Sequence, residues 1–318
     1  MYVKNEHMRR NDTLKIVFMG TPSYATTILK ALMDDVQMDV VLVVTQEDKP
    51  VGRKQLLTPP HIKAWLQDVG STIEIYQPKL LRTPEAVEKI ASFNPDFIIV
   101  AAYGKLLPKA ILDIAPCINL HASLLPKYRG ASPIQSTLLE GETYAGVTSM
   151  LMEEGLDTGA MLGFCFHRVE KNETSGVLFE TLAQYAADLT RMTLKHFDAL
   201  DPLAQKSCDA SHCKKIKKEE GEVTFEQSAQ SIMRRFRGLT PWPGVFLPSG
   251  LKLLALEERE DAHDTAIGVI TSIEKEGVVL TCKEGALLIK RVQPVSKNAM
   301  HACDYIRGQR MGIGDSLA

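Results

Sequence analysis

The sequence lacks the features of membrane-spanning and secreted proteins. No apolar run approaches the roughly 20 residues that a membrane-spanning helix needs. Residues 1–12 are polar and have no apolar centre of the kind found in a secretory signal. We therefore expect a protein that stays in the cytoplasm, and we treat residues 1–12 as an N-terminal extension in which Met8 offers an alternative start.

Cysteine is scarce, with six residues scattered among 318. This excludes a small disulfide-stabilised scaffold and predicts reduced thiols. The tightest cluster is Cys208, His212 and Cys213, which are three conceivable zinc ligands. No fourth ligand stands nearby at the spacing of a structural zinc site, so we expect no metal.

Neither sign of charge predominates, since the chain has 37 Lys and Arg residues and 39 Asp and Glu residues. Basic residues do gather locally. Four lysines lie within residues 214–218, and three arginines lie within residues 234–237. Such clusters can neutralise a phosphate backbone, although a run of charges is more often a solvated face.

The first two hundred residues alternate between short apolar runs and amphipathic stretches. The apolar runs predict strands at residues 14–19, 39–45, 73–76, 96–102, 117–120 and 148–152. The amphipathic stretches predict helices at residues 24–33, 84–93 and 133–139. This alternation favours an α/β fold with a doubly wound, mostly parallel sheet. The first turn contains Gly20 alone instead of the G-x-G-x-x-G pattern, which disfavours a nicotinamide-dependent dehydrogenase.

Three polar side chains follow these strands. Asn119 and His121 stand two residues apart at the end of a predicted strand, so both project from one face near the edge where α/β sheets bind ligands. Asp157 lies in a glycine-flanked turn. An amide donor for an oxyanion, an imidazole for proton transfer and a carboxylate to orient the imidazole suit acyl transfer without a covalent intermediate. Spacing alone favours structural roles in a turn, a core and an Asx-turn.

Five short motifs occur in the same order as in a known protein family, and two more follow in the second half of the chain. They lie at residues 18–22, 48–53, 102–108, 119–126, 155–159, 218–221 and 241–244. Together they closely resemble the motifs of bacterial methionyl-tRNA formyltransferases, and the match runs from about Leu14 to the C-terminus.

The resemblance implies transfer of the formyl group of 10-formyltetrahydrofolate, the cosubstrate, to the α-amino group of methionyl initiator tRNA. The product would be N-formylmethionyl-tRNA for translation initiation. It also implies that Asn119, His121 and Asp157 are catalytic. The residues that it places in or near the folate site are Ser123, Leu124, Leu125, Pro126, Leu106 and Gly155.

The resemblance further implies two tRNA-binding regions. Residues 46–57 form a polar segment between a strand and the next helix, which predicts a mobile loop. In the family, the corresponding loop reaches the acceptor end of the tRNA. This loop lacks a second glycine and an extra basic residue that some relatives carry; without the resemblance it would be a solvated loop. The candidate tRNA contacts are Lys49, Arg53, Lys54, Lys214, Lys215, Lys217, Arg234 and Arg237, followed by Lys290, Arg291 and Lys297.

The domain boundary is expected where apolar periodicity stops. We predict a catalytic domain at residues 13–202, a linker at 203–221 and a tRNA-binding domain at 222–318. The last begins with a helix at 226–236. Short strands follow at residues 245–246, 252–256, 266–273, 277–282 and 286–292. This pattern predicts a small barrel, and it resembles the OB-like C-terminal domain of the family.

Other functions remain open at this point. The nearest is another folate-dependent formyltransferase, acting on glycinamide ribonucleotide or on a nucleotide-linked amino sugar. A non-catalytic ligand-binding module would tolerate the loss of any of the three polar residues, yet all are present. An RNA-binding protein would explain the barrel but not the folate-site resemblance. We expect a monomer.

Overall fold

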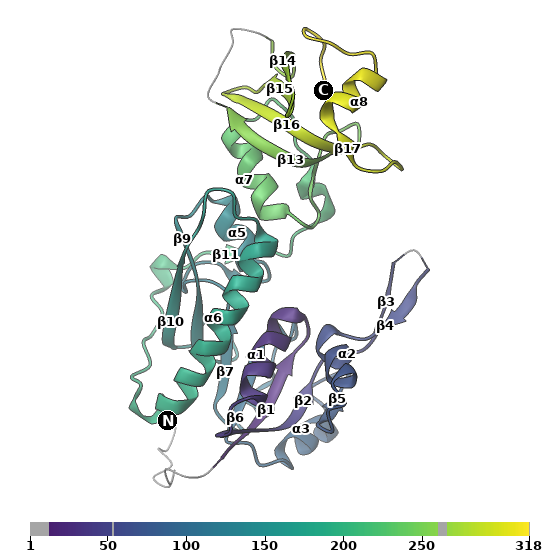
Figure 1. The fold of residues 1–318 in the computed structure, drawn as a ribbon. Coiled ribbons are helices and arrows are strands. Elements are labelled where there is room, and N and C mark those ends of the chain that lie inside the picture. Colours follow the sequence, from purple (N-terminus) through teal and green to yellow (C-terminus); the bar gives the residue numbers. More distant parts are fainter. Residues whose placement is uncertain (1–12, 53, 260–265, 318) are drawn as a thin grey trace. The chain divides into compact units, whose positions relative to one another are not determined.

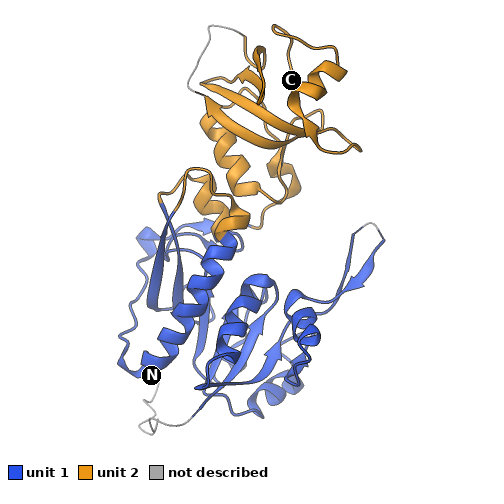
Figure 2. Ribbon diagram, in the orientation of Figure 1, with its two compact units in different colours: residues 1–133, 144–168, 179–214 blue, residues 134–143, 169–178, 215–318 orange. Residues whose placement is uncertain are grey.

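The computed structural model describes residues 13–52, 54–259 and 266–317. The expected N-terminal extension, residues 1–12, lies outside the described residues. The chain divides into two compact units. Unit 1 contains residues 1–133, 144–168 and 179–214, and unit 2 contains residues 134–143, 169–178 and 215–318 (Figure 2).

A seven-stranded sheet in the order β10-β9-β7-β6-β1-β2-β5 forms the centre of unit 1 (Figure 1). Its strands are β1 (Leu14–Gly20), β2 (Met38–Val44), β5 (Glu74–Tyr76), β6 (Phe97–Ala101), β7 (Cys117–His121), β9 (Tyr144–Leu151) and β10 (Met161–Arg168). The five strands from β5 to β7 run parallel. Strand β9 runs antiparallel to both of its neighbours, β7 and β10. The predicted mostly parallel α/β sheet is therefore confirmed.

Helices cover both faces of this sheet. They are α1 (Ser23–Met33), α2 (His61–Asp68), α3 (Pro84–Ala91), α4 (Lys109–Leu112) and α6 (Ser175–His196). On one face, α3 and α4 bury Ile90 and Ile111 against alternate residues of β1, β2 and β6. Tyr24 of α1 meets Phe179 of α6 edge to face, with ring centroids 5.6 Å apart.

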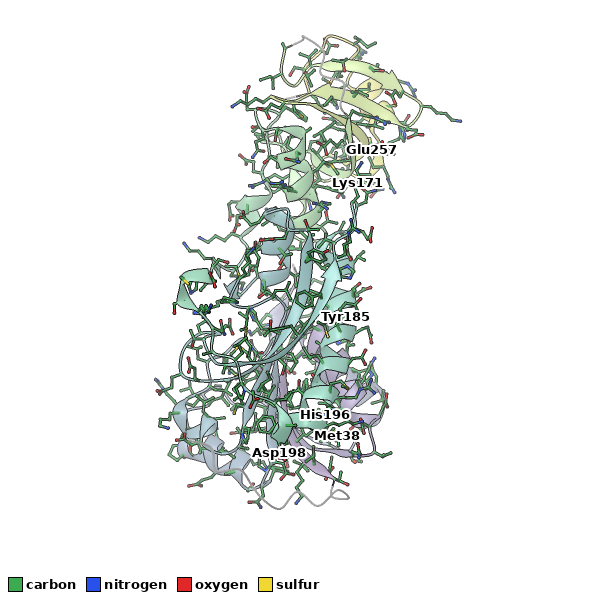
Figure 3. All side chains as sticks on the ribbon, turned by 90° about the vertical axis from the view of Figure 1, so that its left-hand side faces the viewer. Met38, Lys171, Tyr185, His196, Asp198 and Glu257 are labelled. Carbon is green, nitrogen blue, oxygen red and sulfur yellow. The ribbon has the colours of Figure 1, made fainter. Side chains whose placement is uncertain are left out.

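The sequence did not lead us to expect β10 or the 22-residue helix α6. Strand β10 lies at the edge of the sheet and exposes Phe164 and Phe166. This exposure hides the alternation of polar and apolar residues by which a half-buried strand is recognised. Tyr185 of α6 (Figure 3) lies beside His167 of β10, with ring centroids 5.9 Å apart.

Residues 46–57, which we expected to be a mobile loop, contain an antiparallel hairpin. Strand β3 (Lys49–Val51) pairs with β4 (Leu56–Thr58), which corrects that expectation. The base of the hairpin is held by Asp48, which accepts hydrogen bonds from Lys63 at 2.8 Å and from Gln77 at 2.8 Å. The bonds from Gln77 and Lys63 hold the pKa of the Asp48 carboxyl below its usual value. The contacts of Asp48 with Lys63 and Gln77 thus anchor the base of a hairpin whose own strand side chains are exposed.

Unit 2 is built on an antiparallel sheet in the order β12-β13-β16-β15-β14, with β17 paired to β16. Its strands are β12 (Val245–Phe246), β13 (Lys252–Arg259), β14 (Ile270–Glu274), β15 (Gly277–Thr281), β16 (Ala286–Gln293) and β17 (Met300–His301). The other α-helices in the described part of the chain are α5 (Pro133–Leu139), α7 (Ala229–Leu239) and α8 (Ala302–Gly308). The predicted series of short strands is confirmed, their pairing is antiparallel, and β17 and α8 were not expected.

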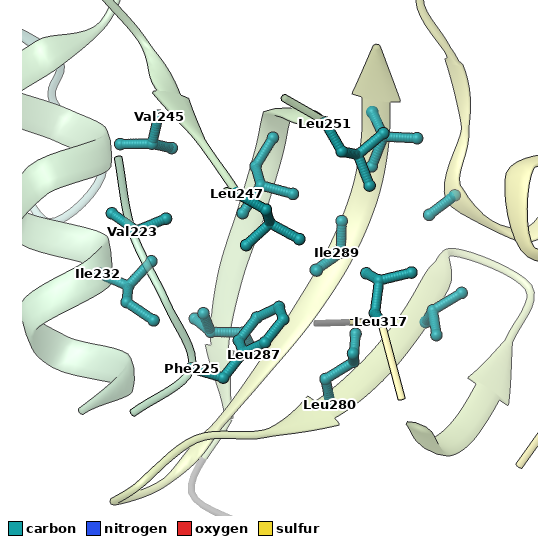
Figure 4. Packing of buried hydrophobic residues seen from close by; sticks show 14 of the residues in the cluster. Val223, Phe225, Ile232, Val245, Leu247, Leu251, Leu280, Leu287, Ile289 and Leu317 are labelled. Carbon is teal, nitrogen blue, oxygen red and sulfur yellow. The ribbon is translucent and has the colours of Figure 1, made fainter. Parts of the chain in front are cut away.

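The core of unit 2 lies between this sheet and α7 (Figure 4). Phe225, Ile232 and Leu287 are almost fully buried there. Helix α7 begins three residues later than residue 226, where we expected it. The Ser228 side chain caps it by accepting a hydrogen bond from the amide of Ser231 at 3.1 Å.

Candidate active site

The candidate site lies at the carboxyl end of β7. Asn119 and His121 belong to this strand, and their exposed fractions are only 9% and 6%. The chain runs from β1 outward to β2 and β5, and then returns to β6 and β7 on the other side of β1. This reversal falls between β1 and β6, and open α/β sheets form their ligand sites at such points; β7 is the next strand beyond β6.

The third predicted residue, Asp157, meets the other two. Its Oδ1 accepts a hydrogen bond from Asn119 Nδ2 at 3.3 Å, and its Oδ2 lies 3.7 Å from His121 Nδ1. The backbone amide of Gly130 donates to the same Oδ2 at 2.8 Å. The fold thus brings together an amide, an imidazole and a carboxylate from positions up to 38 residues apart.

The orientation of the His121 ring is set by a backbone carbonyl. Its Nε2 lies 2.9 Å from the carbonyl oxygen of Tyr128. A carbonyl oxygen only accepts hydrogen bonds, so Nε2 carries a hydrogen and Nδ1 is the nitrogen that can gain or lose a proton. Nδ1 faces the Asp157 carboxylate. Sequence reasoning missed the contact with Tyr128 because a backbone carbonyl belongs to no side-chain motif.

The Tyr128 backbone is itself held by residues from much later in the chain. Its amide donates to Ser211 Oγ at 2.9 Å, and the Cys213 thiol lies 3.4 Å from its carbonyl oxygen. The adjacent strands β8 (Arg129–Gly130) and β11 (His212–Cys213) pair in parallel. Part of the segment at 203–221 therefore supports the site.

The candidate folate residues differ in their exposure. Ser123 is buried, and its hydroxyl donates to the carbonyl of Lys127 at 2.6 Å. Leu125 is buried, and its amide donates to Thr148 Oγ1 at 3.0 Å. Leu124 and Pro126 are half-buried, and Gly155 is exposed. Leu106 is 68% exposed on the loop after β6, which makes its apolar side chain available to a ligand.

The candidate tRNA contacts of the hairpin, of residues 214–217 and of α7 differ in their exposure. Lys49, Lys54, Lys214, Lys215 and Lys217 are exposed. Arg234 and Arg237 are half-buried. Arg53 lies outside the described residues.

Some of these basic groups already have partners in the protein. Arg237 donates to the carbonyl of Lys171 at 3.0 Å, and burial lowers the pKa of its guanidinium. Lys290 lies 2.7 Å from a carboxylate oxygen of Glu257. The hydrogen bond from Lys290 holds the pKa of Glu257 below its usual value, with a further contribution from the charge of Lys171 (Figure 3). Arg237 and Lys290 therefore serve structural contacts within unit 2.

Among residues 13–52, 54–259 and 266–317, no group of three or more His, Cys, Asp or Glu side chains is arranged to hold a metal ion. Within the same ranges, no helix is both long and apolar enough to cross a membrane.

Two family models match the chain. The formyl transferase model matches residues 14–191, and the formyl transferase C-terminal domain model matches residues 215–310.

Among curated proteins, the methionyl-tRNA formyltransferase of a Nitratiruptor species is 50% identical over 306 residues, covering 96% of this chain and 100% of that protein. The methionyl-tRNA formyltransferase of Campylobacter jejuni (strain RM1221) is 50% identical over 304 residues, covering 95% and 99%.

Solved structures share the fold at much lower identity. An N-formyltransferase from Helicobacter canadensis, in complex with folinic acid and dTDP-3-aminofucose, has a TM-score of 0.65 at 15% identity, covering 87% of this chain and 99% of that one. HypX from Aquifex aeolicus in complex with tetrahydrofolic acid has a TM-score of 0.63 at 15% identity. It covers 95% of this chain, which spans 48% of the HypX chain.

Proposed function

The chain belongs to the methionyl-tRNA formyltransferase family, and from that premise we propose that it transfers a formyl group from 10-formyltetrahydrofolate to the α-amino group of methionyl initiator tRNA. The supporting observation is the 50% identity to the Nitratiruptor enzyme over 96% of this chain and the whole of that protein. The similarity to the N-formyltransferase in complex with dTDP-3-aminofucose is at 15% identity and concerns the fold alone. The nucleotide-linked amino sugar is therefore not the substrate that we propose.

Asn119 and His121 at the end of β7, together with Asp157, supply the groups that this reaction needs. The methionyl amine attacks the formyl carbon, and its new C–N bond gives a tetrahedral intermediate with a negatively charged oxygen. Asn119 Nδ2 uses one N–H toward Asp157 and retains a second N–H for that oxygen. Protonated His121 Nδ1 adds positive charge beside it.

Collapse of the intermediate breaks the bond between the formyl carbon and N10 of the folate. The attacking nitrogen loses a proton, N10 gains one, and tetrahydrofolate leaves. His121 Nδ1, protonated beside the oxyanion, is the group placed to give its proton to N10, since Nε2 is engaged with the Tyr128 carbonyl; the neutral ring then takes up the proton that the attacking nitrogen loses. Asp157 orients the ring and balances its charge when it is protonated.

A formylation assay tests the proposed function. The protein is incubated with 10-formyltetrahydrofolate and radiolabelled methionyl initiator tRNA, beside uncharged tRNA and a dTDP-linked amino sugar. We expect N-formylmethionyl-tRNA and no formylated sugar. Formylation of the sugar without formylation of the aminoacyl-tRNA would leave the folate chemistry in place and reject the tRNA substrate.

We propose that residues 13–202 carry the chemistry, that residues 222–318 bind tRNA, and that residues 203–221 join them. We also propose that the protein is cytoplasmic, which a function in translation initiation supports, and that it is a monomer. Exposed lysines at 214, 215 and 217, together with Lys49 and Lys54 of the hairpin, offer positive charge to the phosphates. Arg53 lies outside the described residues, and we include it as a tRNA contact on the resemblance alone.

Replacing the three lysines 214, 215 and 217 by glutamine should weaken tRNA binding and leave turnover of the bound complex unchanged. Each phosphate contact contributes about 0.7 to 0.9 to the slope of log affinity against log salt, so loss of all three should reduce the slope by about 2 to 3. The measurement is tRNA affinity at several salt concentrations. Lys109→Gln, at an exposed lysine of α4, is the control. An unchanged slope in the triple variant would show that these lysines do not contact phosphates.

A further inference from the structure

Asp157 has a backbone conformation that requires support. Its φ angle is 53°, in the left-handed region that residues other than glycine rarely adopt. The preceding residues 153–156 are exposed, so they offer this turn little support. A conformation of this kind persists only where surrounding contacts hold it.

One side chain, that of Gln205, contacts two backbone carbonyls of this turn. Its Nε2 donates to the carbonyl of Asp157 at 2.9 Å and to the carbonyl of Gly159 at 2.8 Å. Both N–H groups of the amide are used, so the turn is held at two points. Gln205 lies 48 residues beyond Asp157 and outside every motif that the sequence analysis singled out.

The other end of the Gln205 amide is held by Arg129. The Nε and Nη2 atoms of Arg129 donate to Gln205 Oε1 at 3.0 and 2.7 Å. A guanidinium only donates and backbone carbonyls only accept, so the amide can be oriented in one way only. Arg129 is 6% exposed, which keeps water from competing for these bonds.

These contacts close into a ring around the carboxylate. Arg129 precedes Gly130, and the Gly130 amide donates to Asp157 Oδ2 at 2.8 Å. The backbone of Asp157 is thereby tied to the Arg129 side chain through Gln205, and its carboxylate is tied to the next amide of the same strand. We propose that Gln205 is a positioning residue, which holds the Asp157 carboxylate against Asn119 and His121. This inference rests on the proposed function.

Gln205→Glu tests the proposal most directly. It keeps an oxygen for Arg129 but replaces the NH2 group with a second oxygen, which faces two carbonyl oxygens and repels them. We expect kcat for formylation to fall on the order of 10- to 100-fold, because small displacements of catalytic groups have effects of this size. The KM values for methionyl-tRNA and for 10-formyltetrahydrofolate should stay close to those of the parent.

A second variant and a control guard against a folding defect. Gln205→Ala removes both ends of the amide at a half-buried position, where water can enter, and should also lower kcat with little change in KM. Ala204→Ser, at the exposed neighbouring position, should match the parent. If a folded Gln205 variant keeps the parent kcat, or raises KM alone, the positioning role is wrong.

Hydrogen exchange of the Gly130 amide provides a readout that does not depend on activity. This amide donates to the Asp157 carboxylate, so it should exchange faster in both Gln205 variants while amides of β1 and β6 keep their protection. Unchanged exchange at Gly130 would overturn the proposal. If the parent failed to formylate methionyl-tRNA, the proposed function would fall, and the exchange experiment would still decide whether Gln205 holds the carboxylate.

Discussion

His121→Ala should lower kcat for formylation by about 10²- to 10⁴-fold, the range found when a general acid–base group is removed. The ring is buried at the end of β7, and its Nε2 is held by the Tyr128 carbonyl, so its Nδ1 is the nitrogen that faces Asp157. The KM for methionyl-tRNA should change little, because the proposed phosphate contacts lie on exposed lysines elsewhere. Steady-state kinetics with both substrates varied would measure the split.

The exposed histidine His196, at the end of α6 (Figure 3), supplies a matched control. His196→Ala removes an imidazole from unit 1 without touching the candidate site, and should keep the parent kcat. A His121→Ala enzyme with normal turnover of bound substrates but a greatly raised KM would assign the ring to binding instead of proton transfer.

Asp157→Asn should lower kcat by about 10²- to 10³-fold, comparable to the loss of an oxyanion-stabilising group. Both carboxylate oxygens accept hydrogen bonds, one from Asn119 and one from the Gly130 amide. An asparagine has a single side-chain oxygen, so one of those donors would face an NH2 group. The variant also removes the negative charge that lies 3.7 Å from His121 Nδ1.

Asp113→Asn is the control for this charge change, because Asp113 is exposed at the end of α4 and pairs there with Lys109. The double variant His121→Ala with Asp157→Asn adds a sharper test. If Asp157 acts through the imidazole, the double variant should lose much less than the product of the two single losses. Losses that multiply fully would mean that the two residues act independently.

Local sequence patterns predicted the central strands well. Strands β1, β2, β6 and β7 lie within two residues of their expected bounds because each is a short apolar run buried on both faces. The hairpin β3–β4 was not expected, since its strands are exposed and its anchors, Asp48, Lys63 and Gln77, are spread over the sequence. Exposed strands and long-range polar anchors leave no periodic signal.

The sequence by itself determined the identity of the three polar residues, the strand that carries two of them, and the family to which the motifs belong. These follow from local patterns and from the order of short motifs, which a linear chain records directly. Only the tertiary structure decided which nitrogen of His121 faces Asp157 and what holds the Asp157 turn. Those answers depend on the Tyr128 carbonyl and on Gln205, which lies 76 residues from its partner Arg129. Backbone carbonyls are present at every residue, so only folding selects the few that orient a site.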